Sequence, residues 1–413
     1  RVGVMKVIHL NNADNSGGAA RAAYRIHNSL SDQDVHSRMW VNHAKSGDWR
    51  IVGPSSKLRK AIVQARSHIV SPILKTMQTE NKILHSPAIL PSSWSKKINK
   101  SDIDIAHLHW IGGEMASISD IGNITKPVVW TLHDMWAFCG AEHYSMDERW
   151  RDRYLKENRL TNESGFDINR WTWKRKIKHW KNPYQIVAVS KWLADCAKNS
   201  VIMKDWPVTY IPNCLNTDIW KPVDKDYARK LLGLPIDVPI IAFGTYGANS
   251  SYYKGFDLLL EALEYVHETC KDAELAIFGQ LPPKKKPELD FNMNFMGHFH
   301  DDISLRLFYS AVDMLIVPSR KEAFGQTASE SLACGTPVVA FGATGLLDIV
   351  DHKVNGYLAK PFESEDLANG INFILNSTNY EKLCDNARNK AVKEFDSNVV
   401  AQKYIELYSD ILK

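Results

Sequence analysis

Two short apolar runs in the second half of the chain, with a polar stretch between them, restrict the possible folds most. Residues 312–318 and 338–341 each have the length and composition of a buried parallel strand. Residues 326–334 between them are predicted to form a helix that Gly335 and Pro337 end. A strand, a helix and a second strand in this order form one unit of an open α/β sheet, where ligands bind at the carboxyl ends of the strands.

Two acidic residues of this stretch are candidates for ligand binding. Glu322 is predicted to lie in the loop after the first strand, and Glu330 within the helix. An ionised carboxylate only accepts hydrogen bonds, so each could hold hydroxyl groups of a sugar or a ribose. Phe324-Gly325 allows a tight backbone turn beside a ligand, and the first amides of the helix offer an anion site. Two glutamates at this spacing are otherwise usually solvated surface acids.

This stretch resembles the Glu-x7-Glu signature of the retaining family 4 glycosyltransferases of GT-B fold. The resemblance covers nearly the whole chain, and its other anchors are Lys254-Gly255, His133-Asp134 and residues 211–213. It implies an α/β protein with two Rossmann-like parallel-sheet domains and a deep cleft between them.

The implied domains have different roles. Residues 1–213 would bind the acceptor, and residues 214–395 would bind a nucleotide-diphosphate sugar. Residues 396–413 would form a tail helix that crosses back to the first domain. A chain of 413 residues is long enough for two domains of about 200 residues each.

Composition is ordinary for a soluble globular protein, with 44% hydrophobic and 24% charged residues. No run reaches the roughly 18–20 apolar residues of a membrane span, and no signal peptide is expected, because an apolar strand begins at once after Met5. The six cysteines have no paired spacing, so neither a disulfide framework nor a zinc site is indicated. These features predict a cytoplasmic protein.

The charge is distributed unevenly along the chain. Residues 1–213 contain 31 Lys and Arg against 19 Asp and Glu, a net charge of +12, whereas the remainder has 20 against 28, a net charge of −8. The first half is therefore expected to meet an anionic partner. Residues 57–77 mix basic and apolar side chains at helical spacing, which fits both peripheral contact with the inner face of the cell membrane and an ordinary surface helix. No nucleic-acid-binding motif is present.

The amino-terminal strand, loop and helix form a Rossmann-like opening. Gly17 and Gly18 lie in the loop between strand 7–10 and helix 19–30, where backbone amides can approach a phosphate. A tight structural turn explains the same glycines. The segment is no G-x-G-x-x-G fingerprint, so a nicotinamide cofactor is weakly supported.

Three polar residues are predicted at the ligand edge of the first sheet as acceptor-binding groups. His109 ends an alternating strand, and His133-Asp134 follow the apolar strand 128–132. The resemblance adds a catalytic role for His133. His107 and His109 share a face and could bind zinc, but no third ligand follows, and no metal is expected. The tryptophan-rich residues 140–182 are predicted to form a helical flap that covers sugar or lipid, or only a packed cover.

The donor site of the second domain departs from the family pattern at one position. Lys254 is expected to pair with the diphosphate at a helix N-terminus. The family usually has an Arg directly after the glycine that corresponds to Gly244, and this chain has Thr245 there, so Arg320 or loop amides around residues 249–251 would have to replace it. Thr344 and Gly345 are further candidates. The predicted donor-binding residues are Gly17, Gly18, Asn213, Gly244, Thr245, Lys254, Gly279, Arg320, Glu322, Ala323, Phe324, Gly325 and Glu330.

The resemblance implies transfer of a hexose, with retention of configuration and without a metal or cofactor, to a saccharide or a lipid-diphosphate-linked saccharide. Such a reaction belongs to polysaccharide biosynthesis of the lipopolysaccharide O-antigen type. His133, Lys254 and Glu322 are the candidate catalytic residues, and Lys254 would stabilise the leaving diphosphate. Glu322 and Glu330 are not expected to be the carboxylate pair of a retaining hydrolase. The base is expected to be the leaving phosphate itself.

Three other functions remain open. A catalytically inactive partner subunit would keep the fold, and Thr245 in place of the usual Arg favours it. A non-hydrolysing sugar-nucleotide epimerase shares the fold and would differ in its products. A nicotinamide oxidoreductase would also have Rossmann domains, although the fingerprint is missing.

Overall fold

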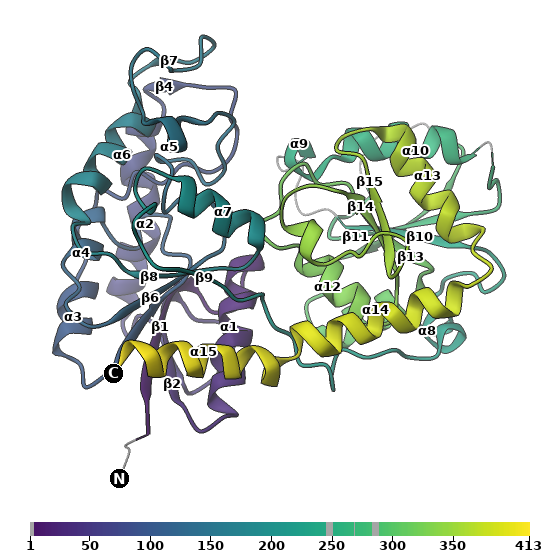
Figure 1. Ribbon diagram of the computed structural model, residues 1–413, viewed down its shortest axis with the longest axis horizontal. Helices are drawn as coiled ribbons and strands as arrows, with labels where there is room; N and C mark the ends of the chain where they lie inside the picture. The colour runs from purple at the N-terminus through teal and green to yellow at the C-terminus, as the bar shows by residue number, and fades with distance from the viewer. Residues whose placement is uncertain (1–3, 245–250, 268, 283–288) are drawn as a thin grey trace. The chain divides into compact units, whose positions relative to one another are not determined.

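The protein consists of two compact units, each built around one parallel sheet (Figure 1). A computed structural model describes residues 4–244, 251–267, 269–282 and 289–413. Unit 1 comprises residues 1–214 and 400–413, and unit 2 comprises residues 215–399. The prediction of two Rossmann-like parallel-sheet domains is confirmed.

The unit 1 sheet has seven parallel strands. In spatial order they are β3 (Ile51–Val52), β2 (His36–His43), β1 (Lys6–Ala13), β5 (Ile105–Leu108), β6 (Val128–Leu132), β8 (Gln185–Ala188) and β9 (Val208–Tyr210). The chain order reverses between β1 and β5, so the carboxyl ends of these strands form the switch point where ligands bind in open α/β sheets.

The core of unit 1 is completed by the carboxyl-terminal helix. α15 (Ser397–Ile411) buries Val400, Ala401, Tyr404 and Tyr408, which recur at helical spacing. These side chains pack against a cluster that includes apolar residues of β1, β5, β6 and α1 (Gly18–Ser31). Unit 1 therefore depends on a segment nearly 200 residues further along the chain than Cys214.

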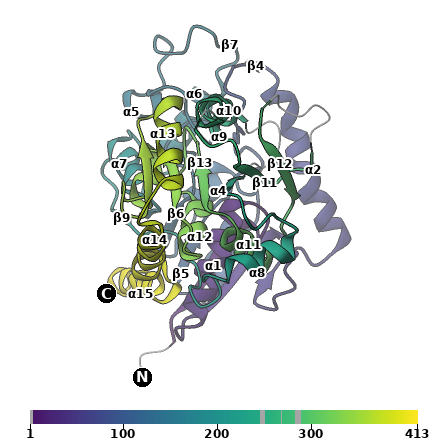
Figure 2. The same cartoon turned by 90° about the vertical axis from the view of Figure 1, so that its right-hand side faces the viewer.

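The remaining elements of unit 1 are mostly short. They are α2 (Lys57–Leu74), β4 (Met77–Gln78), α3 (Trp94–Lys100), α4 (Ile118–Gly122), α5 (Arg149–Asp152), β7 (Ser164–Gly165), α6 (Ile168–His179) and α7 (Lys191–Asn199). The helix predicted within residues 57–77 is α2, which continues past Pro72 and ends at Leu74. β4 and β7 pair as an antiparallel ribbon that both views place at one end of unit 1 (Figures 1 and 2).

The unit 2 sheet has six parallel strands. Their order is β12 (Asn292–Gly297), β11 (Glu274–Phe278), β10 (Ile240–Gly244), β13 (Met314–Val317), β14 (Val338–Phe341) and β15 (Gly356–Ala359). The order reverses between β10 and β13, which makes their carboxyl ends the switch point of this unit. The helices are α8 (Lys225–Leu232), α9 (Ser251–Lys254), α10 (Phe256–His267), α11 (Asp302–Ala311), α12 (Gln326–Ala333), η2 (Thr344–Asp348), α13 (Ser364–Leu375) and α14 (Tyr380–Phe395).

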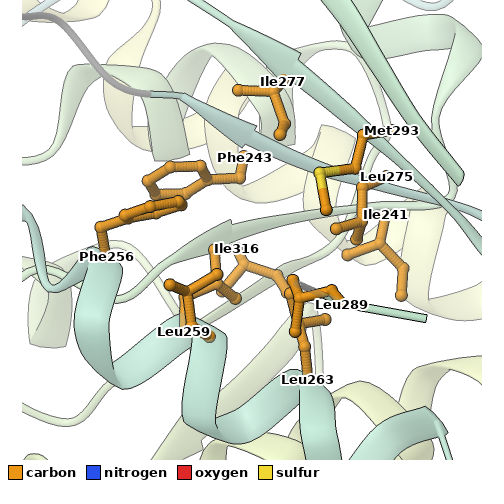
Figure 3. A pocket seen from close by; sticks show the side chains of 11 residues that line it. Ile241, Phe243, Phe256, Leu259, Leu263, Leu275, Ile277, Leu289, Met293 and Ile316 are labelled. Atoms are coloured by element: carbon orange, nitrogen blue, oxygen red, sulfur yellow. The ribbon is translucent and has the colours of Figure 1, made fainter. Parts of the chain in front are cut away.

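A small void lies in the core of unit 2 between the sheet and α10 (Figure 3). Its lining is entirely apolar, and Phe243 stacks on Phe256 at one side with ring centroids 5.4 Å apart. The cavity volume of about 10 Å³ is at the lower limit for one water molecule, and a water there would find no polar partner. This void is therefore a packing feature and not a substrate pocket.

Candidate active site

An ion pair stands at the switch point of the unit 2 sheet. Lys254 is the last residue of α9, which follows β10, and Glu322 lies in the loop after β13. The Lys254 ammonium donates to Oε1 of Glu322, and the Ser319 hydroxyl donates to the same oxygen at 2.9 Å. The lysine side chain keeps 37% of its surface exposed and the glutamate 16%. Because an ammonium has three donors, Lys254 can hold an anion while it stays paired with Glu322.

The loop that carries Glu322 is fixed from behind by the segment after β14. The Glu322 amide donates to the Thr344 hydroxyl at 3.0 Å, and the Gly345 amide donates to the Glu322 carbonyl at 2.9 Å. A Cβ at Gly345 would lie 2.6 Å from the Ala323 carbonyl oxygen, so the two segments approach as only a glycine permits. Thr344 and Gly345 thus position the loop.

Gly255 allows the segment after α9 to lie directly against the loop after β13. Its φ of +67° is in the left-handed region, and a Cβ there would lie 1.8 Å from the Pro318 carbonyl oxygen. Gly325 has φ +108° and precedes α12 without a side-chain cap, so the first amides of α12 are not satisfied by a capping side chain. The predicted tight turn at Phe324-Gly325 and the predicted start of the helix directly after it are therefore both present.

Glu330 occupies a different environment from a solvated helix acid. It lies on α12, is only 1% exposed, and its Oε2 accepts from the Tyr309 hydroxyl at 3.1 Å. A buried carboxylate must keep hydrogen-bond donors around it. Its role in holding the donor ribose stays a prediction.

Arg320 is already engaged by another acid. Its guanidinium makes two parallel bonds to the Asp257 carboxylate at 2.8 and 2.6 Å, and it stacks over the Tyr252 ring at 4.4 Å. The bidentate pair satisfies the charge of Arg320 locally, which disfavours it as a replacement for the usual diphosphate-binding Arg. Thr245 and residues 249–250 lie outside the described residues, so the rest of the clamp stays a prediction.

The other predicted donor residues fall into two groups. Gly244 and Gly279 stand at the carboxyl ends of β10 and β11, where ligands bind. Ala323 and Phe324 are buried, and the Phe324 ring packs against Phe395, so only their backbone could face a ligand.

The predicted donor residues of unit 1 lie at the start of α1 and in the irregular segment after β9. Gly17, with φ +94°, precedes α1, and Gly18 is its first residue. Asn213 is buried, and its Oδ1 has no hydrogen-bond partner among the described residues.

In unit 1 the predicted His109, His133 and Asp134 do lie together at the carboxyl ends of β5 and β6. The Nδ1 of His109 is 3.1 Å from Nε2 of His133. The Nε2 of His109 is 2.8 Å from Nδ1 of His9. Sequence analysis missed His9, whose strand β1 pairs with β5 so that His9 stands opposite His107. The alternation of β1 and β5 could have indicated it, but only with the strand pairing known.

The three histidines His9, His107 and His109 are the group nearest to a metal site among the described residues, with ring nitrogens within 4.8 Å of one another. However, both nitrogens of His107 bind hydroxyls, those of Tyr408 at 2.6 Å and Thr131 at 2.7 Å. The direct bond between His9 and His109 also occupies nitrogens that a zinc ion would need at about 2.0–2.1 Å. The donor set fits a hydrogen-bonded cluster better than a metal site.

Asp134 orients the aromatic groups around it. Its carboxylate accepts from the Trp110 indole at 2.8 Å and from His143 Nδ1 at 2.6 Å. His143 Nε2 lies 2.8 Å from the Ser86 hydroxyl. The sequence of contacts from Asp134 through His143 to Ser86 resembles a hydrolase triad. However, Ser86 is buried and accepts from the Gly113 amide, so it is not placed as a nucleophile.

A small pocket with a cavity volume of about 10 Å³, room for about one water molecule, opens beside these groups, and aromatic side chains dominate its lining. Its ring-bearing and acidic lining residues are His109, Trp110, Trp130, His133, Asp134, Trp136 and His143. Rings that are apolar on their faces and polar at their edges suit a ligand with both apolar faces and hydroxyl groups. A sugar has this character, but the pocket is too small to enclose one, so a sugar could only lie against its mouth, where Trp110, His133 and Asp134 are partly exposed.

Electrostatics set the protonation of this pocket. Burial lowers the pKa of His133 to about 4, so the imidazole is neutral at pH 7. Burial alone would raise the pKa of Asp134, but His143 and the hydrogen bonds from Trp136 and Trp110 outweigh it and lower the pKa. The pocket thus holds one carboxylate and a neutral His133.

Two family models match the chain, one in each unit. The model described as Glycosyltransferase Family 4 matches residues 16–219, and the model described as Glycosyl transferases group 1 matches residues 243–394. An uncharacterized glycosyltransferase of Methanocaldococcus jannaschii is 27% identical over 54% of this chain and 59% of the relative. Lipopolysaccharide 1,2-N-acetylglucosaminetransferase of Salmonella typhimurium is 26% identical over 48% of this chain and 55% of the relative. The chain spans about half the length of the curated relatives it matches.

Solved structures support the same fold over the whole chain. Sucrose-phosphate synthase from Thermosynechococcus elongatus is 17% identical with a TM-score of 0.66, over 98% of this chain and 99% of that protein. Anabaena HepE in complex with UDP-glucose is 17% identical with a TM-score of 0.64, over 98% of this chain and 100% of that protein. The chain therefore belongs to the family 4 glycosyltransferases with the GT-B fold.

Proposed function

We propose that this protein transfers a hexose from a nucleotide-diphosphate sugar to a saccharide or lipid-linked saccharide in polysaccharide biosynthesis. The observation that carries this proposal is the Lys254–Glu322 pair at the switch point of the unit 2 sheet. The pair presents a cation and an acid at the one edge of the sheet where a nucleotide sugar would lie. The name of the Salmonella relative agrees with a role in surface polysaccharide, and the HepE structure holds UDP-glucose.

The chemistry follows from charge development on the diphosphate. As the glycosidic bond breaks, negative charge grows on the leaving group, and Lys254 together with the amides of α12 stabilises it without reorganising. Glu322 binds the sugar hydroxyls, and Glu330 binds the ribose. Retention of configuration and independence from metal are part of this proposal. Both are checked by the anomer formed and by activity in the presence of EDTA.

The acceptor is assigned to the mouth of the aromatic pocket of unit 1, because the pocket itself is too small to enclose a sugar. The partly exposed Trp110 would cover a face of the sugar, while His133 and Asp134 bind hydroxyl groups. The positive charge of residues 1–213 suits an acceptor that carries phosphate.

Glu330→Gln is expected to remove nucleotide binding while it preserves the fold. Wild-type protein at a nucleotide concentration of 100 Kd should gain about 2.7 kcal/mol, a rise in Tm of about 5–10 °C for a unit of this size. The isosteric amide loses the ionised acceptor for the ribose hydroxyls, so this rise should disappear. Thermal scans against a panel of nucleotide diphosphates and their sugars measure it.

The control for this experiment is Glu381→Gln, which changes an exposed acid of α14. It should keep the wild-type response. An undiminished rise in Glu330→Gln would contradict the ribose assignment.

An inactive partner subunit is the second candidate. The pairing of Arg320 with Asp257 favours it, because this removes one replacement for the usual diphosphate-binding Arg. Lack of any nucleotide response in the wild type would support this candidate, whereas slow hydrolysis of the donor would exclude it. Interconversion of free nucleotide sugars would indicate an epimerase instead.

We further propose that α2 holds the protein peripherally at the inner face of the cell membrane. Leu58, Ile62 and Ile69 are 71%, 51% and 59% exposed and lie within one narrow arc of the helix. Lys57 and Arg59 flank this arc on its two sides, as in helices that lie on anionic lipid. Figure 2 shows α2 at the outside of unit 1. Among the described residues, no helix has the length and apolar character needed to cross a bilayer.

Co-sedimentation with vesicles tests this contact. Wild-type protein is expected to bind vesicles with anionic lipid. Leu58→Ser combined with Ile62→Ser should weaken binding about tenfold or more, because two apolar side chains that would insert into the lipid are lost. Ile303→Ser, an equally exposed position on α11 of unit 2, is the control. Equal binding by all three proteins would contradict the proposal.

A further inference from the structure

The histidines of unit 1 form a chain that ends at the pocket. Nδ1 of His9 lies 2.8 Å from Nε2 of His109, and Nδ1 of His109 lies 3.1 Å from Nε2 of His133. His9 is 0% exposed and His109 is 2% exposed, whereas His133 is half-buried and lines the pocket. The chain therefore has one closed end, at His9, and one open end, at His133.

The number of protons leaves only two arrangements. Burial keeps the pKa of all three imidazoles below the usual value, so each ring is neutral and carries one proton. Each of the two bonds between rings uses one proton. The third proton lies at an end of the chain, on Nδ1 of His133 or on Nε2 of His9.

The surroundings of His9 decide between these arrangements. Its Nε2 is buried and has no hydrogen-bond partner among the described residues. A proton on this atom would be a buried donor without an acceptor, and orphaned buried N–H groups are rarer than acceptors with an unused lone pair. The favoured arrangement leaves the His9 nitrogen bare and puts the proton on Nδ1 of His133.

The closed end also excludes a path for protons. A proton taken up by His133 could pass to His9, but His9 has no partner to which it could release it. A ring whose pKa burial lowers to about 4 is in addition a weak base at neutral pH. The chain is thus suited to fix a tautomer and not to carry a proton away.

We propose that His9 and His109 are positioning residues that hold His133 as the Nδ1–H tautomer, so that His133 donates a hydrogen bond to an oxygen of its ligand and does not take up a proton. The tautomer of one ring nitrogen is commonly set by the bond that the other nitrogen makes. That the ligand is the acceptor sugar rests on the proposed function, whereas the tautomer pattern does not.

Side-chain ¹⁵N NMR of the full chain labelled at histidine tests the pattern directly. At pH 7.5 we expect His9, His109 and His133 all to carry their proton on Nδ1, with scalar coupling across both N–H···N bonds. Loss of one signal set in His133→Gln assigns that residue. An Nε2–H signal from His133 in the folded wild type would overturn the proposal, whether or not the protein transfers sugar.

Variants separate positioning from packing. In His109→Leu, the Nε2 of His133 loses its donor, and its signals should shift to an Nε2–H population. His27→Leu removes an equally buried imidazole that is bonded to Ser37 and not to the chain, and it should leave His133 unchanged. A shift in the control but not in His109→Leu would contradict the assignment.

Activity provides a second readout if the sugar donor is identified. Asn places its amide donor near the position of Nδ1, whereas Gln places it near Nε2. His133→Asn should therefore keep at least tenfold more kcat than His133→Gln, and the reverse order would argue for a base at this position. Failure of both wild-type transfer and nucleotide binding would count against the proposed function alone.

Discussion

Lys254→Ala is expected to lower kcat/KM for sugar transfer by about 10²–10³-fold, or roughly 3–4 kcal/mol of transition-state stabilisation. Lys254 is the cation that stands at the switch point of unit 2, and its ammonium is held in place by Glu322. A preorganised charge of this kind acts mainly on the developing charge of the leaving diphosphate. The loss should therefore appear in kcat more than in KM, as initial rates over a range of donor concentrations would measure.

The matched control for this prediction is Lys271→Ala. Lys271 is exposed and precedes β11, at the amino edge of the same sheet, away from the ends where ligands bind. Its removal should leave both kinetic constants within about twofold, as surface changes commonly do. Equal losses in the two variants would mean that net charge, and not position, supports the reaction. An unchanged kcat in Lys254→Ala would refute the assignment.

Local sequence patterns were sufficient to predict the framework of the second unit. The apolar runs 312–318 and 338–341 correspond to β13 and β14, and helix 326–334 corresponds to α12 (Gln326–Ala333). Gly325 adopts a positive φ, as the tight turn predicted at Phe324-Gly325 requires. These elements are encoded within a few residues, by hydrophobic period and by glycine, so no tertiary information was needed.

The contacts of the candidate site were less accessible from the sequence. Lys254 and Glu322 were separate candidates, and only the adjacency of β10 and β13 joins them. Arg320 was a candidate replacement for the usual diphosphate-binding Arg, and only the structure shows that it pairs with Asp257. The bracing by Thr344 and the contribution of His9 likewise depend on the order of strands in the sheets. Side chains that meet across a sheet carry no local periodicity, so pattern reasoning cannot pair them.

Unit 1 is expected to lose stability steeply as the pH falls below about 6.5, the pKa of an unperturbed histidine. His27 is buried, and burial lowers its pKa to about 4, with a smaller lowering by Arg50 that Asp48 partly offsets. The unfolded chain takes up a proton between pH 6.5 and 4, whereas the folded protein does not. Stability is therefore fully present above pH 6.5 and is lost as the pH falls through this window, by about 3 kcal/mol for His27 alone.

The other buried histidines add to this loss. Burial lowers the pKa of His9, His107 and His109 well below the usual value, so each should contribute up to about 1.4 kcal/mol per pH unit in the same direction. Glu142 opposes them in part, because burial raises its pKa to about 7 and its neutral form is favoured in acid. The net slope below pH 6.5 should still reach several kcal/mol per pH unit.

Urea unfolding followed by tryptophan fluorescence at pH 7.5, 6.5 and 5.5 measures this slope in unit 1, because Trp220 alone of the 13 tryptophans belongs to unit 2. His27→Asn should reduce the slope by about 1.4 kcal/mol per pH unit, and His36→Asn, at an exposed position of β2, should leave it unchanged. A slope near zero in the wild type would show that the imidazoles take up protons in the folded state. The histidine chain would then carry a charge next to the pocket in mild acid, and His133 could not stay the neutral donor that the geometry indicates.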